Sequence, residues 1–418
     1  MTNRDGGLRL NVNLQGFGQR PAAWQVTAAP ADAQLTPDFW VTVAREAERG
    51  LLDAVFFADH PSIGNPNPRP LGFNEPLVLA SVITAETERI GVIASASTTY
   101  NDPVELAERL LAADELSGGR IGWNVVTTYA PNVARNFGLD SNPDRTERYQ
   151  RADEVVGAVL AVWDAAGTGG DYRFDGEFVR VAGHTGLAPS AQGHPVLFQA
   201  GGSPQGRTLA ARRADGVFAV ELTKEGSARN RAELRAEAAA LGRPGRPAVT
   251  PGLSLVIGST EAEAQALFDD LESRVPPTYA LRSLSNVLAH DATTLDPDAP
   301  VPAAILDQPW DPTTHPASAG YRTTFLDWIQ GRREATVREL VRQFGGYGAR
   351  IIVGTPEAIA DDIEEWYLDG AADGFNLMLD RYPEGLTAFV DEVVPLLQAK
   401  GIFRREYAAT TLRGNLGL

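Results

Sequence analysis

Residues that could bind a ligand or transfer a proton follow several short apolar runs of this sequence. They are Asp59 and His60 after residues 53–58, Ser97 and Thr98 after 89–96, Asn124 to Thr127 at the end of 121–126, Gly201 to Ser203 after 196–200, and Glu221 after 215–220. If these runs are parallel strands, their carboxyl ends meet at one face, where barrel enzymes carry their active sites. The spacing therefore predicts one pocket that is assembled from strand ends.

Asn124 is the strongest candidate for a ligand contact or a catalytic role. It stands beside Trp123 inside the apolar run, so the two side chains should point to opposite faces of a strand. A buried amide without a partner costs about 1–3 kcal/mol, so a buried strand rarely carries one that nothing uses. We expect Trp123 to pack in the core and Asn124 to face a ligand.

The sequence Gly201-Gly202-Ser203 precedes a helix and offers free N–H groups and a hydroxyl at its positive end, which suits a phosphate. An ordinary helix cap with flexible glycines is the alternative. Arg145 and Tyr149, one helical turn apart, could face the same phosphate, although Tyr149 also falls on the apolar side of its helix. Asp59 could accept a hydrogen bond from a ribityl or sugar hydroxyl, or could be a helix cap or a surface charge.

His60 is the best titratable candidate for catalysis, although an exposed or structural histidine is the more common role for such a residue. The chain has five His and no Cys, which excludes disulfides, thiolate nucleophiles and cysteine-based metal sites. The histidines lack the HxxxH or HExxH spacing of a metal site, so none is expected.

Composition excludes some classes of partner. The net charge of −17 argues against nucleic acid and anionic membranes as partners. Neither a signal segment nor an apolar run of 18 residues is found, so we expect a cytoplasmic protein.

The elements that must position these residues form a regular series. Eight short apolar runs alternate with helical segments; they cover residues 8–14, 53–58, 89–96, 121–126, 196–200, 215–220, 249–257 and 374–379. This order predicts a (β/α)8 TIM barrel, one domain over residues 1–418, with insertions after strands 4 and 7. A doubly wound open sheet is the alternative, but no GxGxxG follows the first strand. The second insertion, about 260–350, carries Trp310, His315 and Tyr321 and could be a lid over the substrate or an oligomer contact.

Several long motifs resemble one enzyme family. They are SGGRIGWNVVTTYAPNVARNFG (117–138), RYQRADEVVGAVLAVWD (148–164), QAGGSPQGRTLAARRADGVF (199–218), and the tail from VGTPEAIADDIEEWYLDGAADGFNLM (353–378) through FRREYAATTLRGNLGL (403–418). Together they resemble the nitrilotriacetate monooxygenase family, a branch of the bacterial-luciferase-like superfamily, in order along nearly the whole chain.

The resemblance implies a luciferase-like barrel that forms a homodimer or homotetramer and uses reduced FMN from a separate NAD(P)H-dependent flavin reductase. It implies that O2 is activated as a flavin C4a-peroxide and that one oxygen atom enters a small organic substrate, such as an aminopolycarboxylate, a sulfone or a heterocycle. On the residues that match the family's motifs, it implies FMN contacts at Asp59, Thr98, Asn124, Tyr149, Gly202 and Ser203.

Two positions depart from the family pattern. Arg145 stands where relatives often have a His, and Gly202 replaces the first serine of a motif that commonly reads AGSS. Arg145 could still meet the phosphate as a cation, and the loop keeps its backbone donors. These departures leave open a flavin-binding protein without turnover. A deazaflavin-dependent oxidoreductase of the same superfamily is a further alternative.

Overall fold

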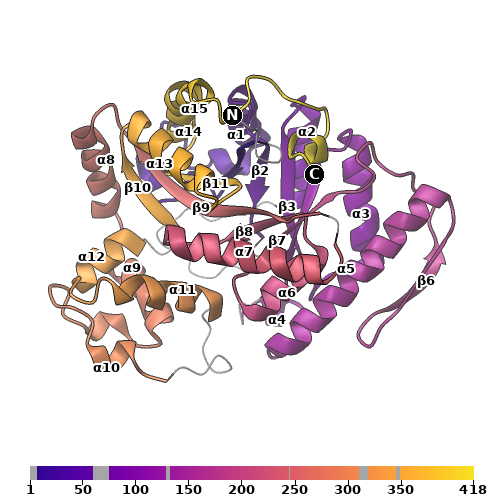
Figure 1. Cartoon of the computed structure of the whole chain (residues 1–418), viewed down its shortest axis with the longest axis horizontal. Helices are drawn as coiled ribbons and strands as arrows, with labels where there is room; N and C mark the ends of the chain where they lie inside the picture. Colours follow the sequence, from indigo (N-terminus) through magenta and orange to yellow (C-terminus); the bar gives the residue numbers. More distant parts are fainter. Residues whose placement is uncertain (1–6, 60–74, 129–131, 244, 310–318, 345–348) are drawn as a thin grey trace.

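The computed structural model describes residues 7–59, 75–128, 132–243, 245–309, 319–344 and 349–418. Its centre is a closed barrel of eight parallel strands, in the order β9–β11–β1–β2–β3–β4–β7–β8, with β8 pairing back to β9 (Figure 1). These strands are β1 (Arg9–Asn13), β2 (Ala54–Phe57), β3 (Gly91–Ser97), β4 (Ile121–Val126), β7 (Val196–Ala200), β8 (Gly216–Ala219), β9 (Ala248–Ile257) and β11 (Gly374–Leu379). All eight predicted strands are present, which confirms the (β/α)8 barrel.

Helices follow the strands and cover the outside of the barrel. They are α1 (Pro37–Arg49), α2 (Pro76–Ala85), α3 (Pro103–Leu116), α5 (Arg145–Thr168), α6 (Pro204–Arg213), α7 (Lys224–Ala240), α13 (Pro356–Leu368), and α14 (Glu384–Ala388), which continues through the π-helical turn Phe389–Val393 into α15 (Val394–Ala399). Local sequence sets their starts: Asp102 accepts hydrogen bonds from the N–H groups of Val104 and Glu105 at 2.9 and 3.1 Å, with Pro103 at the first helical position. None of the helices in the described part is long and apolar enough to cross a membrane.

Both insertions occur where they are expected. After β4 come α4 (Val133–Asn136) and α5, then the hairpin of β5 (Asp171–Asp175) and β6 (Arg180–His184). After β9 come α8 (Glu261–Ser273), α9 (Pro277–Leu288), α10 (Ala303–Leu306), α11 (Ala319–Gln330) and α12 (Val337–Phe344). Helices α9–α12 gather at one side of the barrel, away from the hairpin (Figure 1). They share a separate hydrophobic cluster that includes Leu284, Phe325 and Trp328.

One strand was absent from the prediction. β10 (Arg350–Gly354) pairs only with β9, outside the closed barrel, and four of its five residues are partly exposed. Because it lies at an edge, it lacks the fully buried pattern of the barrel strands. The final long helix begins at Glu384, and the short helix α16 (Leu412–Asn415) follows it.

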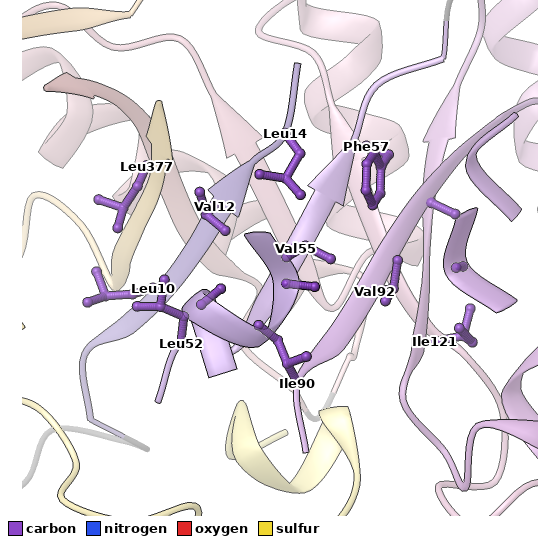
Figure 2. Packing of buried hydrophobic residues seen from close by; sticks show 14 of the residues in the cluster. Leu10, Val12, Leu14, Leu52, Val55, Phe57, Ile90, Val92, Ile121 and Leu377 are labelled. Carbon is purple, nitrogen blue, oxygen red and sulfur yellow. The ribbon is translucent and has the colours of Figure 1, made fainter. Parts of the chain in front are cut away.

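The two faces of the barrel strands pack differently. Leu10, Val12 and Val55 point outward and pack together beneath the helices (Figure 2). Alternate residues point inward, where Phe56 and Phe198 meet edge to face with ring centres 6.4 Å apart. The inner wall also carries amides and hydroxyls on β1, β3, β4, β9 and β11: Asn11, Ser95, Asn124, Ser254 and Asn376. A barrel interior is usually filled by branched apolar residues, so these polar groups indicate a site.

The C-terminal segment closes the amino end of the barrel. Leu412 is fully buried in the cluster of Phe56, Ile93 and Phe198, and its N–H donates to the Gly119 carbonyl at 2.9 Å. The Arg9 Nε donates to the Leu416 carbonyl at 2.7 Å. The amino end is therefore sealed by protein, and the carboxyl end is left for ligand binding.

Candidate functional site

Asn124 lies on the inner face of β4, and Trp123 lies on the outer face. The Trp123 ring packs edge to face on Trp163 at 6.3 Å, and its Nε1 donates to the Ala96 carbonyl at 3.1 Å. The side chain of Asn124 is 2 % exposed, and its Nδ2 donates to Ser95 Oγ at 2.7 Å. Its Oδ1 is buried and has no hydrogen-bond partner among the described residues. The predicted separation of the two side chains is confirmed, and Asn124 keeps a free acceptor inside the barrel.

Hydroxyl groups join the carboxyl ends of β3 and β4. The Thr98 hydroxyl and N–H both donate to the Val126 carbonyl, at 3.1 and 2.9 Å. Thr128 has φ +46°, a left-handed conformation that is rare for a β-branched residue, and its hydroxyl donates to Ser97 Oγ at 2.7 Å. Thr98 is therefore used by the fold, and Ser97 is the residue on the same inner face as Ser95 and Asn124.

The amino end of α6 brings Ser203 to Tyr149. Ser203 is 5 % exposed, and its Oγ accepts the Gly206 N–H at 3.1 Å, as a helix cap does. The same hydroxyl lies 3.4 Å from Tyr149 Oη, across 54 positions of the chain. Arg145, one turn before Tyr149, begins α5. The structure thus places two predicted phosphate contacts together at a positive helix end, with Arg145 on the same side of α5 by its spacing.

A side chain on Gly201 would crowd two polar groups. A Cβ at this position would lie 2.7 Å from Gln199 Nε2 and 3.2 Å from Tyr149 Oη. Gly202, in contrast, is exposed. The Gln199 amide was missed by sequence reasoning, although it carries the same signal as Asn124: a polar amide inside an otherwise apolar strand. Backbone N–H groups, a serine, a tyrosine and an amide therefore converge on one small region.

Glu221 follows β8 at the same end of the barrel but is turned toward α7. Its Oε1 accepts a hydrogen bond from Asn230 Nδ2 at 2.7 Å. Burial raises the pKa of Glu221 to about 7, opposed by the Asn230 hydrogen bond and the charge of Arg229. We therefore assign this carboxyl group to the packing of α7.

The remaining predicted residues are less well placed. Asp59 is half-buried directly after β2, at the carboxyl end of the barrel. His60, Trp310 and His315 lie outside the described residues, so the roles given to them stay predictions. Tyr321 lies on α11 and packs against the cluster of the second insertion. Within the described ranges, no group of three or more His, Asp or Glu could hold a metal ion.

Comparisons with known proteins agree with this geometry. The family model described as luciferase-like monooxygenase matches residues 21–373. The chain is 37 % identical to N-acetyl-S-(2-succino)cysteine monooxygenase of Bacillus subtilis (strain 168), covering 100 % of this chain and 98 % of the relative. It is 33 % identical to nitrilotriacetate monooxygenase component A of Aminobacter aminovorans, covering 98 % and 96 % of the two chains.

A solved structure gives the same result in three dimensions. The EDTA monooxygenase of Chelativorans sp. BNC1 superposes with a TM-score of 0.86 at 33 % identity, over 99 % of this chain and 98 % of that chain. The overall fold is thus that of a known monooxygenase over nearly the whole chain. The chain belongs to the luciferase-like monooxygenase family, and it is a flavin-dependent monooxygenase.

Proposed function

We propose that this protein is the oxygenase component of a two-component system, which takes reduced FMN and O2 and oxygenates a small organic substrate. The observation that carries the proposal is the cradle of Gly201, Ser203 and Tyr149 at the amino end of α6, at the same end of the barrel as Asn124. One pocket can then hold the phosphate of a flavin nucleotide at the rim and its ring inside the barrel.

The residues present fit FMN. Glycine at 201 lets Gln199 Nε2 and Tyr149 Oη stand close to the loop backbone, and these donors suit a phosphate dianion. Asn124 Oδ1 is a buried acceptor without a partner in the described part of the chain, and the ring of a reduced flavin carries N–H groups that could donate to it. Arg145 would add a positive charge near the phosphate. When bound, FMN supplies the activation of O2.

The protein's own contribution is to orient the flavin and to exclude water. The aromatic pair Phe56 and Phe198 fills the inside of the barrel, and Leu412 closes its amino end. A reactive oxygen adduct of a flavin survives only where water is kept away, so a sealed barrel suits this chemistry. We expect the second insertion to border the substrate on the open side, although it could equally form an oligomer contact.

The names of several relatives support a proposal for the substrate class. N-acetyl-S-(2-succino)cysteine and dimethyl sulfide are thioethers, dibenzothiophene sulfone is a sulfone, and nitrilotriacetate and EDTA are amines. These compounds all carry carbon bonded to sulfur or nitrogen. We therefore propose a small sulfur- or nitrogen-bearing substrate for this chain.

The designation component A of one relative implies a separate component, and we propose that an NAD(P)H-dependent FMN reductase supplies the reduced flavin here. We also propose a homodimer or homotetramer, as the family resemblance implies.

Rapid mixing of the protein with reduced FMN and then with O2 tests the function. We expect a transient absorbance of a C4a-peroxyflavin and, with a suitable thioether or amine, an oxygenated product detected by mass spectrometry. If no transient species is seen and no product forms with any substrate of these classes, the proposal is refuted. Tight FMN binding without oxygen uptake would instead support a flavin-binding protein without turnover. Parallel titration with a deazaflavin cofactor distinguishes the hydride-transferring relatives.

A further inference from the structure

The Gln199 side chain carries a buried amide oxygen that has no hydrogen-bond partner within the described part of the chain. Gln199 pairs in register with Val125 of β4 and Val217 of β8, so its side chain leaves the sheet on the outer, otherwise apolar face. It is 2 % exposed, and its Oε1 is buried without a hydrogen-bond partner among the residues described. A buried acceptor without a partner costs about 1–3 kcal/mol, so packing alone does not account for an amide at this position.

The other end of the amide faces the amino end of α6. Its Nε2 lies 2.7 Å from the point where a Cβ on Gly201 would be, and Tyr149 Oη lies 3.2 Å from that same point. Tyr149 Oη is in turn 3.4 Å from Ser203 Oγ. Three polar side chains from β7, α5 and α6 thus gather around one glycine at the amino end of α6.

The groups around Gly201 are suited to an anion. The amide Nε2, the two hydroxyls and the free N–H groups of the first turn of α6 can all donate hydrogen bonds. The nearby carboxylate of Asp153 on α5 is already paired with Arg212 and Arg213, at 2.5 and 2.7 Å. Asp153 therefore adds no unpaired negative charge that would repel an anion at this helix end.

We propose that Gln199 is a phosphate-binding residue, whose Nε2 donates to the phosphate of FMN and lets the protein distinguish FMN from riboflavin. This inference rests on the proposed function and gives a role to Gln199, which opens the motif at 199–218 but was not among the FMN contacts that the resemblance implies. It also gives a reason for glycine at 201, since a Cβ there would lie 2.7 Å from the amide nitrogen and would displace it.

Flavin binding by the full-length protein tests the role of Gln199 without requiring turnover. Dissociation constants for FMN and for riboflavin are measured by quenching of flavin fluorescence, for the wild type, Gln199→Leu and Gln199→Glu. We expect Gln199→Leu to bind FMN about tenfold more weakly and riboflavin within about twofold of the wild type, because only FMN carries the charge-assisted contact. Gln199→Glu, of nearly equal volume, should weaken FMN binding further, because a carboxylate repels the phosphate.

Gln265→Leu is the matched control, because Gln265 is exposed on α8 and bonded to Asp269. Equal losses for FMN and riboflavin, or unchanged FMN binding in Gln199→Leu, would overturn the role of Gln199 and leave the proposed function standing. Failure of the wild type to bind either flavin would refute both. Thermal unfolding of each variant verifies folding, and Gln199→Glu keeps the test decisive if the leucine variant does not fold.

Discussion

Replacing Asn124 with leucine should separate stability from flavin binding. Asn124 Oδ1 is buried without a partner in the described structure, and Nδ2 donates to Ser95 Oγ at 2.7 Å. Leucine has nearly the same shape as asparagine and lacks the unpartnered oxygen. Because burying that oxygen without a partner destabilises the wild type by about 1–3 kcal/mol, its removal alone should raise the free energy of unfolding. The variant also loses the hydrogen bond to Ser95, a loss of about 0.5–1.5 kcal/mol, and it strands the Ser95 hydroxyl.

The double variant Asn124→Leu/Ser95→Ala removes both partners and isolates the difference. We expect its free energy of unfolding without flavin to be unchanged or higher than that of the wild type, by up to about 2 kcal/mol. FMN and riboflavin should both bind about tenfold more weakly, because the contact is made with the flavin ring that the two share.

Urea unfolding followed by circular dichroism gives the stability, and flavin fluorescence gives both dissociation constants. The double variant of Asn11 and Asn376 to leucine is a useful comparison, because these two residues stand in register on β1 and β11 and their buried amide atoms have no hydrogen-bond partner among the described residues. A loss of more than about 2 kcal/mol in Asn124→Leu/Ser95→Ala together with unchanged flavin affinity would show that Asn124 is a structural residue, and the reasoning would be wrong.

Three further predictions concern stability. Leu412→Ala should lower the free energy of unfolding in urea by about 2–5 kcal/mol, whereas Leu418→Ala, at a residue that is 39 % exposed, should change that free energy by less than about 0.5 kcal/mol. Equal effects would contradict the sealing role of the C-terminal segment. Arg404→Met should cost about 3–5 kcal/mol at neutral pH because it removes the ion pair of the fully buried Asp53 carboxylate, which then depends on the Leu10 N–H and the charge of Arg9. A variant as stable as the wild type would refute that pairing. Burial raises the pKa of Glu221 from 4.5 to about 7, so its contribution to stability is present below about pH 4.5 and is lost as the pH rises through 7. Relative to Glu221→Gln, the free energy of unfolding of the wild type should fall by at most about 3 kcal/mol over that window. Parallel pH profiles of the two proteins would exclude the shift.

The barrel could be predicted because each of its strands is an apolar run with both faces buried, and this pattern is visible residue by residue. β10 does not have the pattern, since it lies at an edge and pairs only with the end of β9. The hydrogen bonding of Thr98 was likewise outside the reach of sequence, because it depends on how the ends of β3 and β4 approach each other.

Short-range patterns thus determined the strands, the opposite faces of Trp123 and Asn124, and the cap that Ser203 places on α6, since each depends on neighbours within a few residues. The tertiary structure alone decided that Tyr149 meets Ser203 and that the Gln199 amide faces Gly201. It also decided that the C-terminal segment closes the barrel at the end opposite the site. These contacts join distant parts of the chain, so they depend on barrel closure and on how the helices pack around it, which no local pattern encodes.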